Sequence, residues 1–149
     1  MATQIRSAVL ADLSSLAQLF DAYRIFYQKP SAIGEAKQFL SARLSNGDAR
    51  IFIAVTDGKV TGFTQLYPLF SSTRMKPLWL LNDLYVDEKF RGQGISVALI
   101  DAAKQLCRDT GACGMFLETA KSNGIGNQLY PRAGFALDGE HNYYEWNVE

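Results

Sequence analysis

The chain has 149 residues, 48% of them hydrophobic and 20% charged, a balance typical of a soluble globular protein with one domain over residues 1–149. Its formal net charge is zero, so no overall field attracts nucleic acid or an anionic membrane surface. No apolar run approaches the ~18 residues of a membrane span, and residues 1–12 lack the apolar core of a signal peptide. Cys107 and Cys113 lack metal-ligand spacing and are expected to be free thiols, so we expect a cytoplasmic protein without a metal site.

The first half of the chain predicts one strand, two helices and a hairpin. Residues 4–9 are short and partly apolar, as in a first strand. Asp12 can cap a helix that ends near position 27. Ser31 can cap a second helix that runs to about position 44 and is ended by Asn46-Gly47. Two further strands are predicted around a type I′ turn: residues 50–56, the dipeptide Asp57-Gly58, and residues 60–69.

The second half alternates strands and helices. Residues 78–86 form an apolar run broken only by Asn82 and Asp83, which predicts a buried strand. After a charged turn, apolar residues recur at helical spacing until Gly111. The remaining predicted elements are a strand at residues 113–118, a short helix at residues 123–132, and a final hairpin of residues 135–137 and 143–148.

A glycine-rich turn joins the apolar strand to the long helix. Gly92 and Gly94 stand where the helix begins, directly after Arg91. Backbone N–H groups at a helix start, approached through glycines and backed by an arginine, form a phosphate site. A Walker loop is excluded because no Gly-Lys-Ser/Thr ending follows. A dinucleotide-binding fingerprint lacks its third small residue, since Val97 stands there, and this disfavours a nucleotide-dependent oxidoreductase.

Two segments carry motifs of a known family. Arg91-Gly92-Gln93-Gly94-Ile95-Ser96 resembles the pyrophosphate-binding motif of the GNAT superfamily of N-acetyltransferases, with Ser96 in place of the usual small residue. A second motif of that family is matched in spacing by Asn123, Tyr130, Gly134 and Phe135, with Gly126 in place of alanine. The resemblance implies an α/β fold, the GNAT acyl-CoA N-acyltransferase fold. That fold has a central mixed, mostly antiparallel sheet of six to seven strands and about four helices.

Residues 62–68 and 82–86 look most like the branch that holds the yeast histone/polyamine and diamine acetyltransferases. The resemblance implies acetyl-CoA as cofactor. It implies as acceptor a primary amine of a small molecule (a polyamine, a lysine analogue or an amino acid) that attacks directly in a ternary complex. A protein or histone lysine as acceptor, and a CoA-binding sensor without turnover, are the alternatives. The branch also implies a homodimer formed through residues 143–148, which otherwise predict a plain edge strand.

The resemblance further assigns roles to individual residues. Tyr130 is expected to protonate the leaving thiolate, unless it is only a core residue packed on Phe135. Backbone N–H groups of the central strand are expected to bind the pantetheine arm and the thioester oxygen. The implied cofactor-binding residues are Leu84, Tyr85, Val86, Arg91, Gly92, Gln93, Gly94, Ile95, Ser96, Asn123 and Tyr130.

The acceptor site is predicted around Asn82 and Asp83. An amine of the lysine kind has a pKa of about 10.4 and must lose a proton before it attacks. In the diamine acetyltransferases a glutamate stands at the position of Asn82, and asparagine cannot accept a proton. Asp83 is therefore the expected base or acceptor anchor, unless it is a structural carboxylate and a water chain or bulk solvent takes the proton. Successive strand residues point to opposite faces, so only one of the two should face the acceptor. Tyr23, Phe26 and Tyr27 would line the acceptor site, unless they belong to the core.

Overall fold

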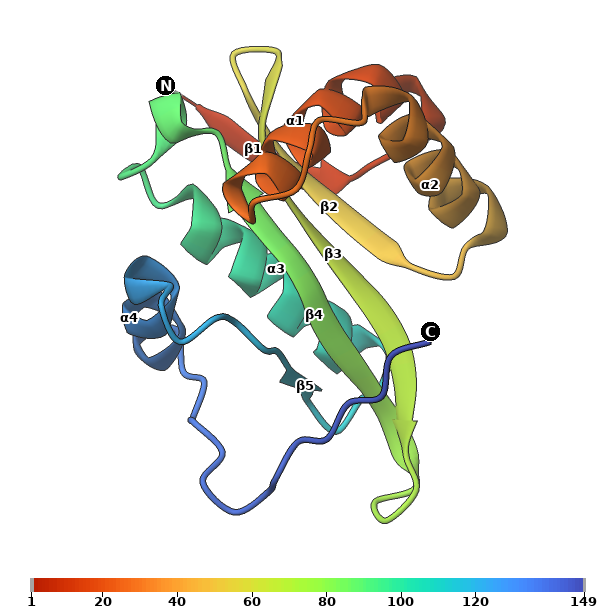
Figure 1. Ribbon diagram of the computed structural model, residues 1–149, viewed down its shortest axis with the longest axis vertical. Coiled ribbons are helices and arrows are strands. Elements are labelled where there is room, and N and C mark those ends of the chain that lie inside the picture. The colour runs from red at the N-terminus through yellow and green to blue at the C-terminus, as the bar shows by residue number, and fades with distance from the viewer. Residues whose placement is uncertain (1, 149) are drawn as a thin grey trace. The chain divides into compact units, whose positions relative to one another are not determined.

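The computed structural model describes residues 2–148, and the chain divides after Glu118 into two compact units. The first unit holds a five-stranded sheet in the order β1-β2-β3-β4-β5 (Figure 1). Strands β1 to β4 pair antiparallel, and β5 pairs parallel to β4. The strands are β1 (Thr3–Ser7), β2 (Arg50–Thr56), β3 (Lys59–Ser71), β4 (Lys76–Val86) and β5 (Met115–Phe116).

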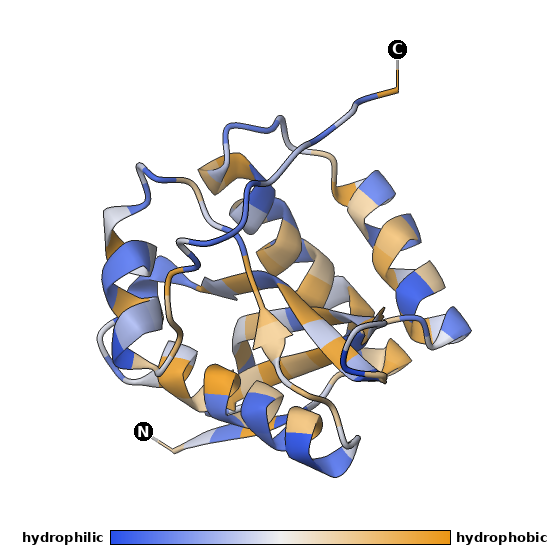
Figure 2. Cartoon of the chain, turned by 90° about the horizontal axis from the view of Figure 1, so that it is seen from below, coloured by the Kyte–Doolittle hydropathy of each residue, from blue (hydrophilic) through white to orange (hydrophobic). Residues whose placement is uncertain are grey.

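Helices cover both faces of this sheet (Figure 1). They are α1 (Leu13–Phe26), α2 (Ile33–Asn46) and α3 (Ile95–Asp109), with short 3-10 turns at Leu10–Asp12 and Glu88–Phe90. Helices α1 and α2 pack on one face, and α3 packs on the other. Figure 2 shows these helices with hydrophobic and hydrophilic residues on different sides, as expected for helices that bury one face.

Side-chain alternation along the strands sorts the core into these two layers. Ile51 and Ile53 pack under α1 and α2, whereas Phe52 and Ala54 pack under α3. Gly62 lets α3 approach closely, because a Cβ there would lie 3.2 Å from the side chains of both Ile95 and Leu99. The helix that begins at the predicted phosphate turn is thus fixed directly on the central strands.

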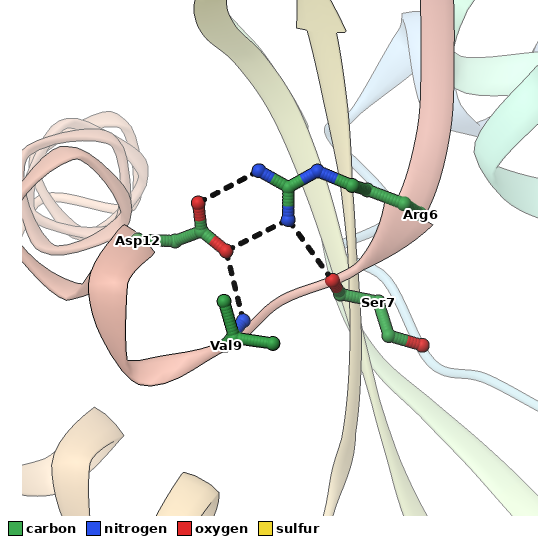
Figure 3. Close-up of polar contacts among 4 residues, drawn as sticks. All are labelled: Arg6, Ser7, Val9 and Asp12. Carbon is green, nitrogen blue, oxygen red and sulfur yellow. Dashed lines mark hydrogen bonds and ion pairs between the residues drawn. The ribbon is translucent and has the colours of Figure 1, made fainter.

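Two helix caps predicted from the sequence are wrong in detail. The Asp12 carboxylate accepts from both Nη atoms of Arg6 at 2.9 and 2.8 Å, and from the Val9 N–H at 2.8 Å, so it joins β1 to α1 (Figure 3). The Arg6 hydrogen bonds hold the pKa of Asp12 below its usual value. Ser31 likewise donates to the buried carboxylate of Asp21 at 2.7 Å and does not cap α2. Both caps are wrong because a partner outside the first turn of the helix takes the side chain.

Two turn predictions are confirmed. Asp57 and Gly58 both have positive φ, 50° and 79°, as a type I′ turn requires. Gly47 ends α2 in the left-handed conformation, with φ 64°. The β3–β4 hairpin is longer than expected, because its ladder continues to the pair Ser71–Lys76.

The second unit contains α4 (Gly124–Arg132), the fourth α-helix within residues 2–148. The final hairpin predicted at residues 135–137 and 143–148 is wrong, since no strand is assigned from residue 119 to residue 148. Over the described chain the sheet has five strands, not six to seven, and β5 is two residues long where residues 113–118 were expected. A strand exists only through a paired neighbour, and the alternation of Tyr144 and Trp146 does not specify one. Both side chains are more than 80% exposed.

No helix within residues 2–148 is long and apolar enough to span a bilayer. Cys107 and Cys113 are free thiols, as predicted.

Candidate active site

The turn between β4 and α3 has the geometry predicted for an anion site. Gly92 and Gly94 adopt φ of 77° and 79°, and a Cβ at either position would meet no atom within 4 Å. The first hydrogen bond of α3 runs from the Ala98 N–H to the Gly94 carbonyl at 3.1 Å. The N–H groups of Ile95 and Ser96 therefore have no acceptor inside the helix. The open space and these amides fit a phosphate group.

Arg91 lies on aromatic rings at the same turn. Its Nε donates to the Val86 carbonyl at 3.0 Å, which ties the turn to the last residue of β4. Its guanidinium carbon lies 5.3 Å from the ring centroid of Tyr85 and 5.8 Å from that of Phe26. These are cation–π distances, so a positive charge is held over the rings beside the helix start.

The three aromatic residues predicted near the acceptor join this cluster. The Tyr23 ring lies 5.9 Å from Tyr85, and the Phe26 ring lies 6.3 Å from Tyr85. Tyr27 stacks edge-on against Tyr23 at 5.1 Å. Tyr23 also packs against Phe63 in the α1 core, whereas Phe26 and Tyr27 are exposed. Tyr23 therefore belongs in part to the core, as the alternative prediction held. Phe26 and Tyr27 instead form an exposed aromatic surface.

The second half of β4 has one edge that β5 does not pair. The β4–β5 ladder comprises only Trp79 and Leu80 of β4. Asp87 donates its N–H to the Thr61 carbonyl on β3 at 2.8 Å. Because an antiparallel ladder alternates, the N–H and C=O groups of Val86 and Leu84 point away from β3, toward the open edge. The side chains of Leu84 and Val86 pack with the α3 layer, and Tyr85 packs on the α1 side.

A β-bulge lies at the predicted acceptor residues. Gln65 pairs with Asp83 and Leu66 pairs with Leu81, so Asn82 is the extra residue of β4. The Asn82 Nδ2 donates to the Asp83 Oδ2 at 3.1 Å, although neighbours on a regular strand point to opposite faces. The bulge breaks the regular alternation at these two residues, and the expectation that only one of them faces the acceptor stays a prediction.

Asp83 is buried, with 6% of its surface exposed, and Gln65 is fully buried. The Gln65 Nε2 donates to the same Asp83 Oδ2 at 2.8 Å. Burial and then the charge of Asp83 raise the pKa of Tyr67 to about 12, so this phenol stays protonated near neutral pH. Neither Gln65 nor Tyr67 was predicted from the sequence as a site residue. The available signal was a glutamine inside a strand that is otherwise largely apolar.

The second unit contains the other predicted motif. Asn123 caps α4: its Oδ1 accepts from the Gly126 N–H at 3.1 Å, and its Nδ2 donates to the Thr119 hydroxyl at 3.0 Å. A Cβ on Gly126 would lie 2.5 Å from the Asn123 Nδ2, so glycine in place of the family's alanine matches this cap. The Tyr130 ring packs edge-on against Phe135 at 5.7 Å. Tyr130 thus makes the packing contact with Phe135 that a structural role requires. Its role as an acid stays a prediction.

A profile of the Acetyltransferase (GNAT) family matches residues 16–135. The chain belongs to this family. An uncharacterized N-acetyltransferase of Bacillus subtilis, YhfO, is 40% identical over 97% of each chain. A crystal structure of a probable acetyltransferase is 37% identical over 98% of each chain, with a TM-score of 0.93. An aminoglycoside N(6′)-acetyltransferase of Klebsiella aerogenes is 28% identical over 68% of each chain.

Membership of the GNAT family makes this chain an acyltransferase with an N-acetyltransferase fold. Acetyltransferases of this fold use acetyl-CoA. The sequence-based assignment of enzyme class is therefore confirmed, and the motif at residues 91–96 lies where the fold begins α3.

Proposed function

We propose that this GNAT enzyme transfers the acetyl group of acetyl-CoA to a primary amine of a small molecule, by direct attack in a ternary complex. One observation carries the proposal: β4 buries a carboxylate, Asp83, three residues before it ends at the anion-binding turn. This strand leads from a buried carboxylate to a phosphate site, and the reaction has two substrates of matching charge. The acceptor amine is a cation that suits the carboxylate, and the cofactor is an anion that suits the phosphate site.

The residues of the β4–α3 turn fit the cofactor. Acetyl-CoA supplies the acetyl thioester when it is bound. The N–H groups from Gly92 to Ser96, with Arg91, would hold its pyrophosphate. The backbone groups of Leu84 and the N–H of Val86 at the open edge of β4 would pair with the pantetheine amides, as an added strand would. Asn123 and Tyr130 of the second unit are assigned to the cofactor by family resemblance alone.

The acceptor amine would bind at Asp83. An amine at neutral pH is mostly protonated, and a carboxylate both binds the cation and accepts its proton. Asn82 holds the Asp83 Oδ2 through a hydrogen bond and cannot itself take a proton. Tyr130 would donate a proton to the departing thiolate. The exposed rings of Phe26 and Tyr27 are available to a cationic or apolar stem of the acceptor.

A polyamine, a lysine analogue or an amino acid fits this site, as in the histone/polyamine and diamine branch that residues 62–68 and 82–86 resemble. The relative named for aminoglycosides acts on an amine-bearing small molecule, which supports the same substrate class. A protein lysine as acceptor, and a sensor without turnover, are the results that would replace this proposal.

We also propose a cytoplasmic homodimer. The exposed aromatic side chains Tyr143, Tyr144 and Trp146 are suited to a subunit interface. The free thiols of Cys107 and Cys113 suit a reducing compartment. Light scattering that gives only a 16.5 kDa particle at micromolar concentration would overturn the dimer.

The test is thiol release from acetyl-CoA with a panel of spermidine, lysine, thialysine, D- and L-amino acids and a histone-tail peptide. We expect one class of small amine to respond and Tyr130→Phe to reduce its turnover. A response to the histone peptide alone would indicate a protein acetyltransferase. Tight CoA binding by calorimetry without turnover on any amine would indicate a sensor. No CoA binding would contradict the proposal altogether.

A further inference from the structure

We propose that Gln65 orients the acceptor amine, because its side-chain carbonyl and the Asp83 carboxylate together receive the N–H groups of a primary ammonium. The inference rests on the proposed function and adds to it the contact that selects the acceptor. Gln65 lies on β3, directly opposite Asp83 in the strand register.

The Gln65 carbonyl is a buried acceptor without a partner. Its Oε1 has no hydrogen bond within residues 2–148, and the side chain is fully buried. Exchanging the amide oxygen and nitrogen of Gln65 would not give Oε1 a partner. Oε1 would then face the Asp83 carboxylate, and the 2.8 Å hydrogen bond from Nε2 would be lost. Buried polar atoms in proteins are nearly always paired, so this one calls for a partner that the described chain does not supply.

Asp83 needs a positive charge at the same place. Its Oδ2 accepts from two neutral amides, those of Gln65 and Asn82, and no ion pair in the described chain includes it. Burial and then the charge of Asp83 raise the pKa of Tyr67, and the more weakly acting charge of Arg43 lowers it. A carboxylate taken out of water without a cation is costly.

One chemical group meets both needs. A primary ammonium carries a positive charge and three N–H donors, enough for Asp83 and for the Gln65 Oε1 together. Water would satisfy the acceptor but not the charge. A divalent metal would need more oxygen ligands, and no group of three His, Cys, Asp or Glu residues is gathered anywhere in residues 2–148. Asn82 is exposed and bonded to Asp83, so the carboxylate lies one side chain from solvent.

The direct test follows the ¹⁵N signal of the Gln65 side-chain amide in the full-length protein. The two probes are n-butylamine and n-butyltrimethylammonium, which carry the same charge but differ in N–H donors. We expect n-butylamine to shift the signal and n-butyltrimethylammonium to leave it unchanged. Equal shifts would mean that charge alone is recognised, and no shift with n-butylamine would mean that this amide contacts no amine. Either result overturns the role of Gln65.

The kinetic test uses Gln65→Leu, which keeps the side-chain volume and removes both the carbonyl and the Nε2 donor to Asp83. We expect the KM for the responding amine to rise about ten- to hundredfold, as for loss of a hydrogen bond to a charged group, with the KM for acetyl-CoA unchanged. Thr61→Val is the matched control, because Thr61 is a buried polar residue of the same strand that is bonded to Thr56 instead. The KM of Thr61→Val for the amine should equal that of the wild type.

The two proposals fail in different ways. If the wild type acetylates amines and Gln65→Leu has a normal KM for the amine, the role of Gln65 is wrong and the proposed function stands. If n-butylamine shifts the Gln65 signal but no amine is acetylated, the contact stands and the proposed function is wrong. The titration uses only wild-type protein, so it decides the point even if Gln65→Leu does not fold.

Discussion

The two halves of β4 differ in what surrounds them. In the first half, Trp79 and Leu80 pair with β3 on one edge and with β5 on the other. After the bulge at Asn82, residues 83–86 pair with β3 alone. One strand therefore has a half that holds the sheet together and a half that leaves backbone groups for another molecule.

Polar groups in the two halves show the same division. The Trp79 indole N–H is buried and donates to the Thr110 hydroxyl at 2.9 Å, so the protein satisfies it internally. Beside Asp83 the Gln65 Oε1 is buried and unpaired. The fold thus satisfies the polar group in the first half and leaves the one beside the second half without a partner, and it is to this second group that we assign the acceptor amine.

The largest expected effect separates the halves by stability. Trp79→Ala should lower the free energy of unfolding by about 3–5 kcal/mol, because it removes a buried ring and leaves a cavity between β4 and α3. Urea unfolding followed by circular dichroism measures this loss. Trp79→Phe, which keeps a ring and loses the Thr110 hydrogen bond, should cost less. If the folded fraction of Trp79→Ala also shows a raised KM for acetyl-CoA, the first half of β4 contributes to cofactor binding as well as to stability, and the division between the halves is wrong.

A smaller effect on stability should accompany a specific loss of cofactor binding. Gly94→Ala forces a Cβ into the left-handed conformation at φ 79°, which costs roughly 1–2 kcal/mol. Gly47→Ala is the matched control, because Gly47 has φ 64° and equally open space at the end of α2. Both variants should lose similar stability in urea, but only Gly94→Ala should raise the KM for acetyl-CoA, by about tenfold. An equal change in KM for the two variants would refute the assignment of the turn.

The smallest expected effect reports the charge of Asp83. The Tyr67 phenol should titrate near pH 12, followed by the ¹³Cζ chemical shift, and closer to 10 in Asp83→Asn because one of the causes that raise its pKa is removed. The folded-state pKa lies above the unfolded value of about 10. The resulting stabilisation is therefore complete below pH 10 and is lost as the pH rises through 12. An unchanged pKa of Tyr67 in Asp83→Asn would show that the Asp83 carboxylate does not act on the Tyr67 phenol.

Much of the first unit follows from local sequence. The turn at Asp57-Gly58, the left-handed end of α2 at Gly47, and the glycines at the start of α3 were predicted correctly because each depends on backbone preferences of one or two residues. The family assignment was correct for the same reason, since its motifs are short and local. The predictions for Asp12 and Ser31 as caps were wrong because distant partners, Arg6 and Asp21, compete for their side chains.

The sequence by itself determined the order of the helices, the glycine turn after β4 and the acetyltransferase family, because hydrophobic period and turn residues act within a few positions. Only the tertiary structure decided the bulge at Asn82, the pairing of Gln65 with Asp83, and the five-stranded extent of the sheet over the described residues. These features depend on which strand lies beside which, and in what register. Residues far apart in the chain set them jointly, so no single segment carries the information.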